Sequence, residues 1–225
     1  MIEEISYSNH KEQAKIGRDS AASQVKTYET PAGTILLRTY CSPSLVECLR
    51  VDEGLRAFAR LPELEYQQLL SVAQQPDSVL ILAYTLTGEI IGQVTLAPAD
   101  SWWQGLANTY EAAIEVSTRW RGLGIAHQLL TCAAELEALE QIIIIGMGLS
   151  WHWDLKGLGL APFSYRTMIE QLFARYGFVE YLTSEENIRM DPANILLARL
   201  GSKVEAERVG EFFDRLLQSD TLPGM

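Results

Sequence analysis

The sequence predicts a single mixed α/β domain. Its first half contains two pairs of strand-like segments, each joined by a short turn, and its second half alternates strand-like with helix-like segments. The chain has 225 residues, too few for two full domains of about 150 residues each, and it shows no internal repeat. Antiparallel strands followed by strand–helix–strand–helix are typical of a mixed α/β domain.

We expect this domain to carry a flank at each end. Residues 1–24 are polar and lack a helical or strand period, which predicts an N-terminal arm. Residues 25–218 form the predicted domain, and residues 219–225 form a C-terminal tail.

Turn residues divide the first half into hairpins and helices. Pro31-Ala32-Gly33 and Leu86-Thr87-Gly88 each separate two strand-like runs, and Ser42 or Ser44 is suited to capping a helix. The expected elements are a hairpin of Val25–Glu29 with Thr34–Tyr40, a helix from Ser42 or Ser44 to about Arg60, a helix over Pro62–Gln75, and a hairpin of Ser78–Thr85 with Glu89–Ala97.

In the second half, the apolar spacing changes from strand-like to helical after Gly124. Tyr110–Thr118 precedes the change and is an expected strand, whereas Ile142–Ile145 has the length and apolarity of a buried strand. A helical face after Gly124 is formed by Ile125, Leu129, Cys132, Ala133 and Leu136. The remaining expected elements are a helix over Phe163–Tyr176, strands over Phe178–Leu182 and Ile195–Leu200, and a closing helix over Val204–Leu217.

Charge and composition exclude several classes of protein. The chain carries 18 Lys and Arg against 29 Asp and Glu, a net charge of −11, whereas nucleic-acid binding needs a basic surface. The longest apolar run, residues 142–147, is far shorter than the roughly 20 residues of a membrane span. Met1–Asn9 lacks the basic and apolar parts of a signal peptide. We expect no nucleic-acid or membrane partner and a cytoplasmic location.

The cysteines and histidines predict no metal site. The 3 cysteines form no CxxC pair, which agrees with a reducing compartment. His10, His127 and His152 have no ligand-like spacing with each other or with the cysteines. Cys132 falls on the helical face and is expected in the core.

The junction between the predicted strand over Tyr110–Thr118 and the following helix predicts an anion site. Gly122 and Gly124 allow a ligand to approach the backbone closely, and the helix start presents free N–H groups and the positive end of its dipole. Arg119 and Arg121 add cationic side chains, so the junction suits a pyrophosphate. A P-loop is excluded because GxxxxGK[ST] is absent, and His127 stands where a Rossmann fingerprint needs its third glycine.

Arg119-x-x-Gly122-x-Gly124 resembles the acetyl-CoA loop of the GCN5-related N-acetyltransferases (GNAT), and the order of elements is similar. The resemblance implies a mostly antiparallel sheet, flanked by helices, whose fourth and fifth strands splay apart around pantetheine. It implies that backbone at Val116 and Ser117 pairs with pantetheine. It further implies acetyl-CoA as co-substrate, with no tightly bound cofactor. The implied pyrophosphate-binding amides are those of Gly122, Leu123, Gly124, Ile125 and Ala126.

A second set of strings resembles the acetoin-utilisation protein acetyltransferases. These strings are Trp151-His152-Trp153-Asp154-Leu155-Lys156-Gly157, Tyr165-Arg166, Pro192-Ala193-Asn194 and Ala198-Arg199-Leu200-Gly201. Residues 1–24 match nothing in that group. The resemblance implies that the acceptor is a lysine of acetyl-CoA synthetase, which acetylation switches off.

Acetylation of an amine needs a base. A lysine of pKa ~10.4 is neutral in only about one molecule in 2,500 at pH 7, a cost of about 4.6 kcal/mol, and a nearby carboxylate reduces that cost. Glu115 is the expected base, because it lies on the predicted fourth strand within an Ala-Ile-Glu-Val string that the acetoin-utilisation group shares. Strand alternation also allows a solvent-facing Glu115, and Glu111 is the alternative if the strand carries a bulge.

The other candidate side chains leave more than one interpretation open. Tyr165 is the expected acid for the leaving thiolate, with Tyr176 and Tyr110 as rivals. Trp151, His152, Trp153 and Asp154 are expected either to bind the acceptor or to form a packed corner in which Asp154 holds the imidazole.

We therefore expect an acetyl-CoA-dependent protein lysine N-acetyltransferase. Two alternatives remain: an enzyme with the same fold that acetylates a small amine such as a polyamine, and a non-catalytic protein that senses acetyl-CoA or inhibits a partner. The acidic charge suits a polyamine and a lysine-bearing loop equally.

Overall fold

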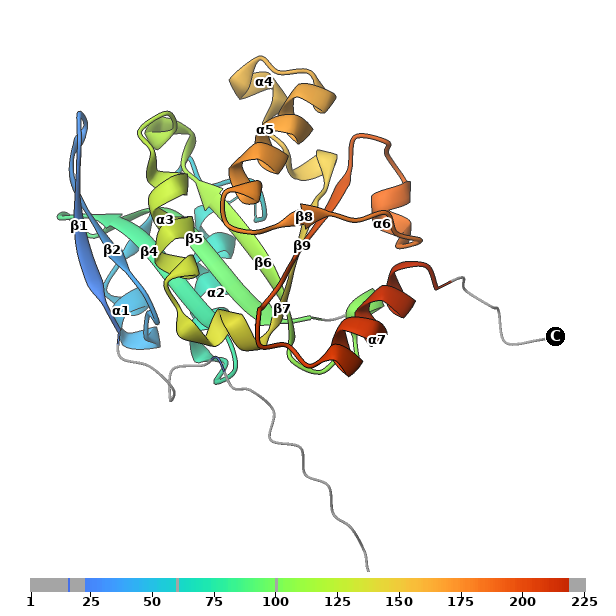
Figure 1. The fold of residues 1–225 in the computed structure, drawn as a ribbon. Helices are drawn as coiled ribbons and strands as arrows, with labels where there is room; N and C mark the ends of the chain where they lie inside the picture. The colour runs from blue at the N-terminus through green and yellow to red at the C-terminus, as the bar shows by residue number, and fades with distance from the viewer. Residues whose placement is uncertain (1–15, 17–22, 60, 100, 219–225) are drawn as a thin grey trace, which may run out of the picture.

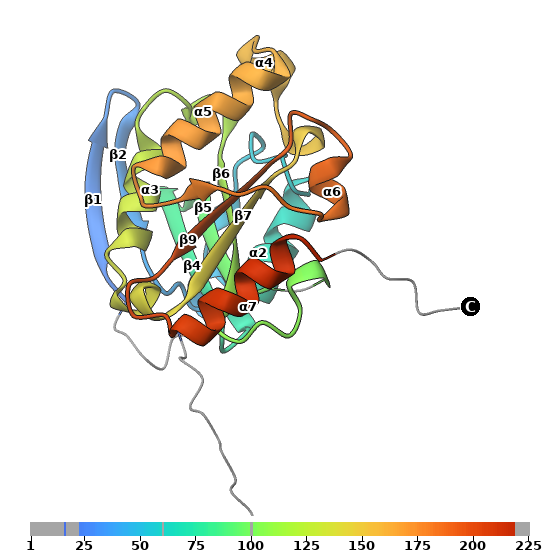
Figure 2. The ribbon, with the colours of Figure 1, turned by 45° about the vertical axis from the view of Figure 1, so that its right-hand side comes forward.

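The computed structural model describes residues 16, 23–59, 61–99 and 101–218. It confirms a mixed α/β fold around one mostly antiparallel, 9-stranded sheet with strand order β1-β2-β4-β5-β6-β7-β9-β8, with β3 paired to β5 (Figures 1 and 2). The strands are β1 (Val25–Thr30), β2 (Gly33–Arg38), β3 (Arg50–Val51), β4 (Val79–Thr85), β5 (Glu89–Pro98), β6 (Thr109–Val116), β7 (Ile143–Gly148), β8 (Val179–Glu180) and β9 (Ile195–Leu200).

Helices cover both faces of the sheet. They are α1 (Pro43–Glu47), α2 (Pro62–Gln74), α3 (Ile125–Ala134), α4 (Leu155–Leu158), α5 (Pro162–Ala174), α6 (Glu186–Arg189) and α7 (Ala206–Leu216), with 3-10 turns η2 (Ser101–Trp103), η3 (Thr118–Trp120), η4 (Glu137–Gln141) and η5 (Ser150–His152). No helix in the described ranges is long and apolar enough to cross a membrane.

Successive side chains of a strand point to opposite faces of the sheet and so pack in different cores. On β4, Ile81 packs in the core that α3 and α5 cover, whereas its neighbours Leu80 and Leu82 pack in the core that α1 and α2 cover. A third cluster joins β7 and β9 to α7 through Phe212 and Trp103. The two hairpins form as predicted, β1 with β2 and β4 with β5. β4 is buried on both faces, whereas β1 alternates between exposed and half-buried residues, as at the edge of the sheet.

One expected helix is wrong. The helix expected to run to about Arg60 begins as predicted, with the Ser42 side chain accepting from the Leu45 amide, but it ends at Glu47. Arg50 and Val51 instead pair in parallel with β5, so long-range pairing overrides the local helical spacing. In the second half, α3 ends at Ala134 before Leu136, and the strand expected over Phe178–Leu182 is reduced to β8.

The predicted arm over residues 1–24 lies largely outside the described residues, as does the predicted tail over residues 219–225. Ile16 is the described exception, and it is buried in the core that α3 covers. Its backbone hydrogen-bonds the Tyr110 hydroxyl. Ser23 and Gln24 form hydrogen bonds to Thr39 at the end of β2.

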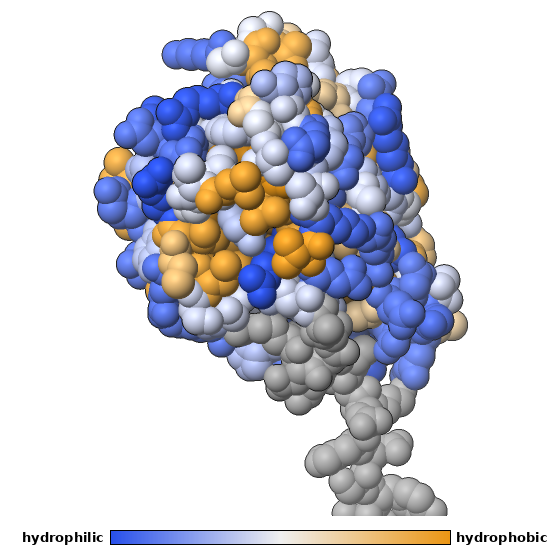
Figure 3. Space-filling model, turned by 90° about the vertical axis from the view of Figure 1, so that its left-hand side faces the viewer, coloured by the Kyte–Doolittle hydropathy of each residue, from blue (hydrophilic) through white to orange (hydrophobic). Residues whose placement is uncertain are grey.

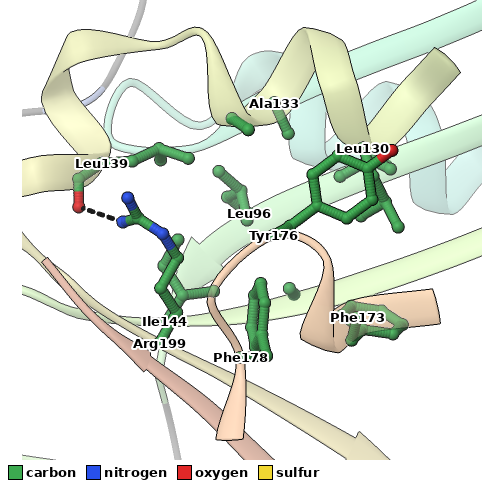
Figure 4. A pocket seen from close by; sticks show the side chains of 12 residues that line it. Leu96, Leu130, Ala133, Leu139, Ile144, Phe173, Tyr176, Phe178 and Arg199 are labelled. Atoms are coloured by element: carbon green, nitrogen blue, oxygen red, sulfur yellow. Dashed lines mark hydrogen bonds between the residues drawn. The ribbon is translucent and has the colours of Figure 1, made fainter. Parts of the chain in front are cut away.

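A small cavity lies beneath α3 and α5 where β5, β6 and β7 meet (Figure 4). Its volume is about 20 Å³, and its lining includes Leu96, Leu130, Ile144 and Phe173. Arg199 also lines it but turns its guanidinium to the Leu139 carbonyl, 2.9 Å away. An apolar cavity of this size offers a water molecule too few polar partners, so we interpret it as a packing defect rather than a substrate site.

The sheet opens between β6 and β7. The two strands pair in parallel only from Thr109 with Ile143 to Glu111 with Ile145. Beyond that point, β6 pairs only with β5 and β7 only with β9. The strands diverge toward the end of the molecule that carries α4 and α5 (Figures 1 and 2). This confirms the splayed fourth and fifth strands expected from the resemblance.

Candidate active site

Glu115 lies on β6 along the open part of this gap. Its side chain is on the α2 side of the sheet and is only 5% exposed, so the solvent-facing alternative is wrong. Oε1 accepts two backbone hydrogen bonds, from Arg56 at 2.6 Å and from Ala57 at 2.8 Å. Oε2 is buried and has no hydrogen-bond partner in the described part of the chain.

Burial raises the pKa of Glu115. The amides of Ala57 and Arg56, and the charges of Arg121 and His152, act in the opposite direction without reversing the shift. A carboxylate whose pKa is raised accepts a proton more readily near neutral pH. The arrangement therefore suits a general base.

His152 is fixed by the same loop that holds Glu115. Its Nδ1 lies 2.9 Å from the Ala57 carbonyl oxygen, and its ring lies against Phe58 with ring centroids 5.4 Å apart. Because a carbonyl oxygen only accepts, Nδ1 donates this hydrogen bond. The backbone of Ala57 thus orients both His152 and Glu115.

The segment after β7 is positioned by Asn194. The Asn194 Oδ1 accepts from the Ser150 amide at 2.7 Å, and its Nδ2 donates to the Asn187 carbonyl at 2.7 Å. The Ser150 hydroxyl donates to Asp191 at 2.6 Å. These bonds attach η5, which contains Trp151 and His152, to the start of β9.

Tyr165, near the start of α5, stacks on Trp153 with ring centroids 4.9 Å apart and planes 13° apart. Burial raises the pKa of its hydroxyl, while the charge of Arg121 and a hydrogen bond with the Asp154 backbone lower it in part. The charge of Glu115 also acts on this hydroxyl. A protonated phenol therefore lies in the electrostatic environment of the buried carboxylate.

The two rival tyrosines have other partners. The Tyr176 hydroxyl donates to the His127 carbonyl at 2.8 Å, and the Tyr110 hydroxyl is bonded to Ile16. Glu111 lies at the last paired position of β6 with β7. Because the register of β6 with β5 is continuous from Val116 to Tyr110, no bulge brings Glu111 to the place of Glu115.

The junction before α3 contains two glycines in a backbone conformation that other residues rarely adopt. Gly122 has φ +76° and Gly124 has φ +78°, both in the left-handed region that favours glycine. A Cβ on Gly124 would lie 2.8 Å from the Tyr28 hydroxyl oxygen, and that hydroxyl donates to the Leu123 carbonyl at 3.1 Å. The first helical bond of α3 runs from Gln128 to Gly124, so the preceding amides lack acceptors within the helix.

Backbone groups of β6 also face the gap. The Ser117 amide donates to Ile91 on the β5 side, so strand alternation turns the N–H and C=O of Val116 toward β7. The Val116 carbonyl accepts from Arg121 Nε at 3.3 Å. An extended ligand between β6 and β7 would meet this backbone.

Comparisons with known proteins identify the family. A sequence model of the Acetyltransferase (GNAT) family matches residues 44–147. Acetoin utilization protein AcuA of Bacillus subtilis is 33% identical over 201 residues, 85% of this chain and 94% of that protein. The chain belongs to the GNAT acetyltransferase family. It is accordingly an N-acetyltransferase, and acetyl-CoA is the co-substrate that GNAT enzymes use.

Solved structures agree with this assignment. The crystal structure of an acetoin utilization protein from Exiguobacterium sibiricum has a TM-score of 0.83 and 32% sequence identity, over 87% of this chain and 94% of that one. AcuA of Bacillus licheniformis is 33% identical over 196 residues, 85% of this chain and 92% of that protein. The GNAT domain of PAT from S. lividans, at 20% identity and a TM-score of 0.50, shows the shared fold alone.

Within this GNAT enzyme, the arginines of the junction are not free cations. Arg119 pairs with Asp52, and its Nη2 lies 3.5 Å from Glu89. Arg121 Nη1 lies 2.6 Å from Asp154 Oδ2, which links the junction to the segment after β7. Both arginine side chains therefore already have carboxylate partners, whereas the amides that precede α3 lack acceptors within the helix.

Sequence reasoning missed Asp52. It is fully buried and accepts from the Ser117 hydroxyl at 2.6 Å and from the Gly54 amide at 2.7 Å. Burial acts to raise its pKa, but the hydrogen bonds from Arg119, Ser117 and Gly54 hold it below its ordinary value. The sequence Asp52-Glu53-Gly54 is typical of a turn and could have drawn attention to Asp52. The helix expected to run to about Arg60 covered these residues, so the turn was not predicted.

The packed-corner interpretation of the Trp-His-Trp-Asp segment was wrong about Asp154. His152 is held by Ala57, whereas Asp154 caps α4 by accepting from the Gly157 amide and pairs with Arg121. The Gly157 amide and Arg121 together hold the pKa of Asp154 below its ordinary value despite partial burial. Trp151 is 48% exposed. Cys132 is buried in the core, as predicted.

Proposed function

We propose that this chain is an acetyl-CoA-dependent protein lysine N-acetyltransferase that acetylates, and thereby inactivates, acetyl-CoA synthetase in the cytoplasm. The observation that carries the proposal is the buried Glu115 beside the open gap between β6 and β7. The similarity to AcuA over 85% of the chain supports the choice of substrate.

In this proposal, acetyl-CoA binds by its pyrophosphate to the amides of Gly122–Ala126. Those amides and the dipole of α3 attract an anion without an added cation. Pantetheine pairs with the gap-facing backbone at Val116, and Arg121 must then release the Val116 carbonyl. Ser117 contributes through its hydroxyl bond to Asp52 rather than through its amide, which β5 already uses.

Glu115 acts as the general base of the proposed reaction. It takes a proton from the lysine ammonium, and the neutral amine attacks the thioester carbon. The C–S bond breaks as the tetrahedral intermediate collapses, and the nitrogen gives its second proton to solvent, to which Glu115 also returns the first. Tyr165 gives the departing thiolate its proton, and solvent restores the phenol.

Exposed apolar side chains around the gap favour a protein acceptor over a small amine. Trp151, Leu158 and Phe163 are 48%, 36% and 60% exposed, and hydrophobic surface is visible at the end of the molecule that carries α4 (Figure 3). Exposed apolar surface of this kind marks protein–protein contact. A polyamine would gain nothing from it.

The test is to incubate purified synthetase, acetyl-CoA and this enzyme, and to measure intact mass and synthetase activity. We expect one added acetyl group with loss of activity, because acetylation removes the charge and a donor of a lysine that must contact an acyl phosphate. A short peptide around the same lysine should react much more slowly. No added mass on the synthetase together with rapid acetylation of spermidine would favour the small-amine enzyme, and no acetyl transfer to either would favour a non-catalytic sensor.

A further inference from the structure

Asp52 is a fully buried carboxylate between two segments that lie far apart in the sequence. From its own segment, the Gly54 amide donates to Oδ1 at 2.7 Å. From the junction before α3, the Ser117 hydroxyl donates to Oδ1 at 2.6 Å, and the Arg119 guanidinium pairs with the carboxylate. A buried carboxylate is costly unless such partners satisfy it. The two segments must therefore stay together for Asp52 to remain satisfied.

The backbones of the two segments also approach each other closely. The Thr118 amide donates to the Gly54 carbonyl at 3.2 Å. A Cβ on Gly54 would lie 2.2 Å from the Ser117 hydroxyl oxygen and 2.7 Å from the Thr118 hydroxyl oxygen. Any residue larger than glycine would therefore force the two segments apart.

The same segment, after its glycine turn, supplies the hydrogen bonds to Glu115. The Arg56 and Ala57 amides donate to Glu115 Oε1 at 2.6 Å and 2.8 Å. Glu115 itself lies two residues before Ser117 in the chain. The bonds at Glu115 and those at Asp52 therefore close a ring between the two segments, so a shift at one set of bonds changes the geometry at the other.

In the other direction, the partners of Asp52 open the junction that presents the proposed pyrophosphate amides. The Ser117 hydroxyl accepts from the Arg119 amide at 3.3 Å and so caps η3, and the Ser117 carbonyl accepts from the Trp120 amide at 2.8 Å. The amides of Gly122–Ala126 follow this turn almost at once. The Asp52 carboxylate thus fixes the point from which the junction starts.

We propose that Asp52 is a positioning residue that couples the acetyl-CoA junction to Glu115. Through Ser117 and Arg119 it holds the start of the junction, and through the turn at Gly54 it holds the amides that orient the Glu115 carboxylate. The coupling rests on the proposed function for the roles of the junction and of Glu115. A change at Asp52 should then alter acetyl-CoA affinity and turnover together, whereas a change confined to either end of the ring should alter only one of them.

The coupling can be tested without ligand or turnover, by NMR of the backbone amides in the full chain. In Asp52→Asn, the new NH₂ group faces a donor in either orientation, because both carboxylate oxygens accept hydrogen bonds. We expect the Arg56 and Ala57 amide signals to move to higher field. Both amides should exchange with solvent about tenfold faster, the scale of one lost hydrogen bond to a charged group. Amides of β4 should keep their exchange rates and serve as the internal reference.

Two further variants make this test decisive. Glu53→Gln is the same kind of change at the exposed neighbour of Asp52 and should leave both amide signals in place. Ser117→Ala removes one donor to Asp52 but keeps the carboxylate; it should loosen the same two amides to a smaller extent, and it serves if Asp52→Asn does not fold. Unchanged Arg56 and Ala57 amides in the folded variant overturn the proposal. So does an equal acceleration of exchange at every amide, which would mean a loss of global stability only.

Calorimetry and kinetics test the consequence. In Asp52→Asn, acetyl-CoA should bind about tenfold more weakly, and turnover at saturating acetyl-CoA should also fall about tenfold. Weaker binding with unchanged turnover would confine Asp52 to the junction and contradict the coupling. Loosened amides with wild-type acetyl-CoA affinity in both Asp52→Asn and Gly124→Val would support the coupling and contradict the proposed pyrophosphate site instead.

Discussion

The two sides of the β6–β7 gap are built in different ways. The donor side, residues 117–128, is mainly backbone: two left-handed glycines and the unpaired amides of a helix start, all within one short stretch of chain. The acceptor side comprises Glu115, the loop at residues 56–58, the segment at residues 150–154 and Tyr165. Hydrogen bonds and ring contacts between segments distant in sequence hold it together.

Under the proposed function, this difference separates binding from chemistry. Substitutions on the donor side should change acetyl-CoA affinity, because they alter the backbone that we propose to bind the pyrophosphate. Substitutions on the acceptor side should change turnover and leave that affinity intact. Only the Arg121–Asp154 pair connects the two sides by a salt bridge between described residues.

The largest effect is expected on the acceptor side. Glu115→Gln should lower turnover by about 10²–10⁴-fold, the usual contribution of a general base, and leave acetyl-CoA affinity unchanged by calorimetry. Raising the pH should restore part of the rate, because more of the acceptor amine is then neutral. Glu111→Gln, on the same face of the same strand, is the matched control and should be close to wild type. Equal losses in both variants would show that neither is the specific base.

Glu65, a buried carboxyl group on α2, should show a cost in stability that depends on pH. The pKa of Glu65 is raised from 4.5 to about 7, so its contribution to stability is fully present below pH 4.5 and is lost as the pH rises to 7. The lost stability amounts to about 3 kcal/mol above pH 7. In urea unfolding, the gain in stability of Glu65→Gln over wild type should therefore grow by about 2 kcal/mol between pH 5.5 and pH 8. Glu63→Gln should show no such growth, and a pH-independent gain in Glu65→Gln would contradict the assignment.

On the donor side, Gly124→Val should weaken acetyl-CoA binding by about 100-fold, equivalent to about 2.7 kcal/mol. The new side chain would collide with the Tyr28 hydroxyl and disfavour the left-handed backbone. Gly105→Val is the control for the backbone strain, because Gly105 has φ +90° with no atom within 4 Å of its Cβ position. If both variants bind acetyl-CoA as the wild type does, the pyrophosphate site lies elsewhere.

A smaller effect should follow when the acceptor side is loosened. Asn194→Ala leaves the Ser150 amide and the Asn187 carbonyl without partners, at a cost of about 1–3 kcal/mol of stability. Turnover should fall, because His152 lies two residues after Ser150 in the same 3-10 turn, while acetyl-CoA affinity should stay constant. Asn187→Ala, whose side chain is exposed, is the control. Unchanged turnover in folded Asn194→Ala would show that this attachment does not position η5 for the reaction.

The same contrast explains what the sequence could predict. Gly122 and Gly124 follow a strand and precede a helix, so the donor side is encoded locally and its geometry was predictable. Hairpins were also predictable, because turn residues and alternation are local signals. The mixed α/β fold followed from the order of these local elements.

The partners that hold the acceptor side were not predictable in the same way. Glu115 was found through its position on the strand, but its hydrogen bonds come from Arg56 and Ala57, in a segment where the sequence predicted a helix. Glu65 is a polar residue on a buried face, and periodicity alone cannot show which charged residue a tertiary contact buries. Asp52 escaped notice because its partner Arg119 lies far along the chain.

The most direct test of the two-sided gap is a crystal structure with bound CoA. We expect the pyrophosphate on the amides of Gly122–Ala126, the pantetheine along the backbone at Val116 with Arg121 displaced, and the thiol between Glu115 and Tyr165. A CoA molecule bound elsewhere, for example in the groove along α2 beside Phe58 and Gln68, with Arg121 still on Val116, would contradict the account.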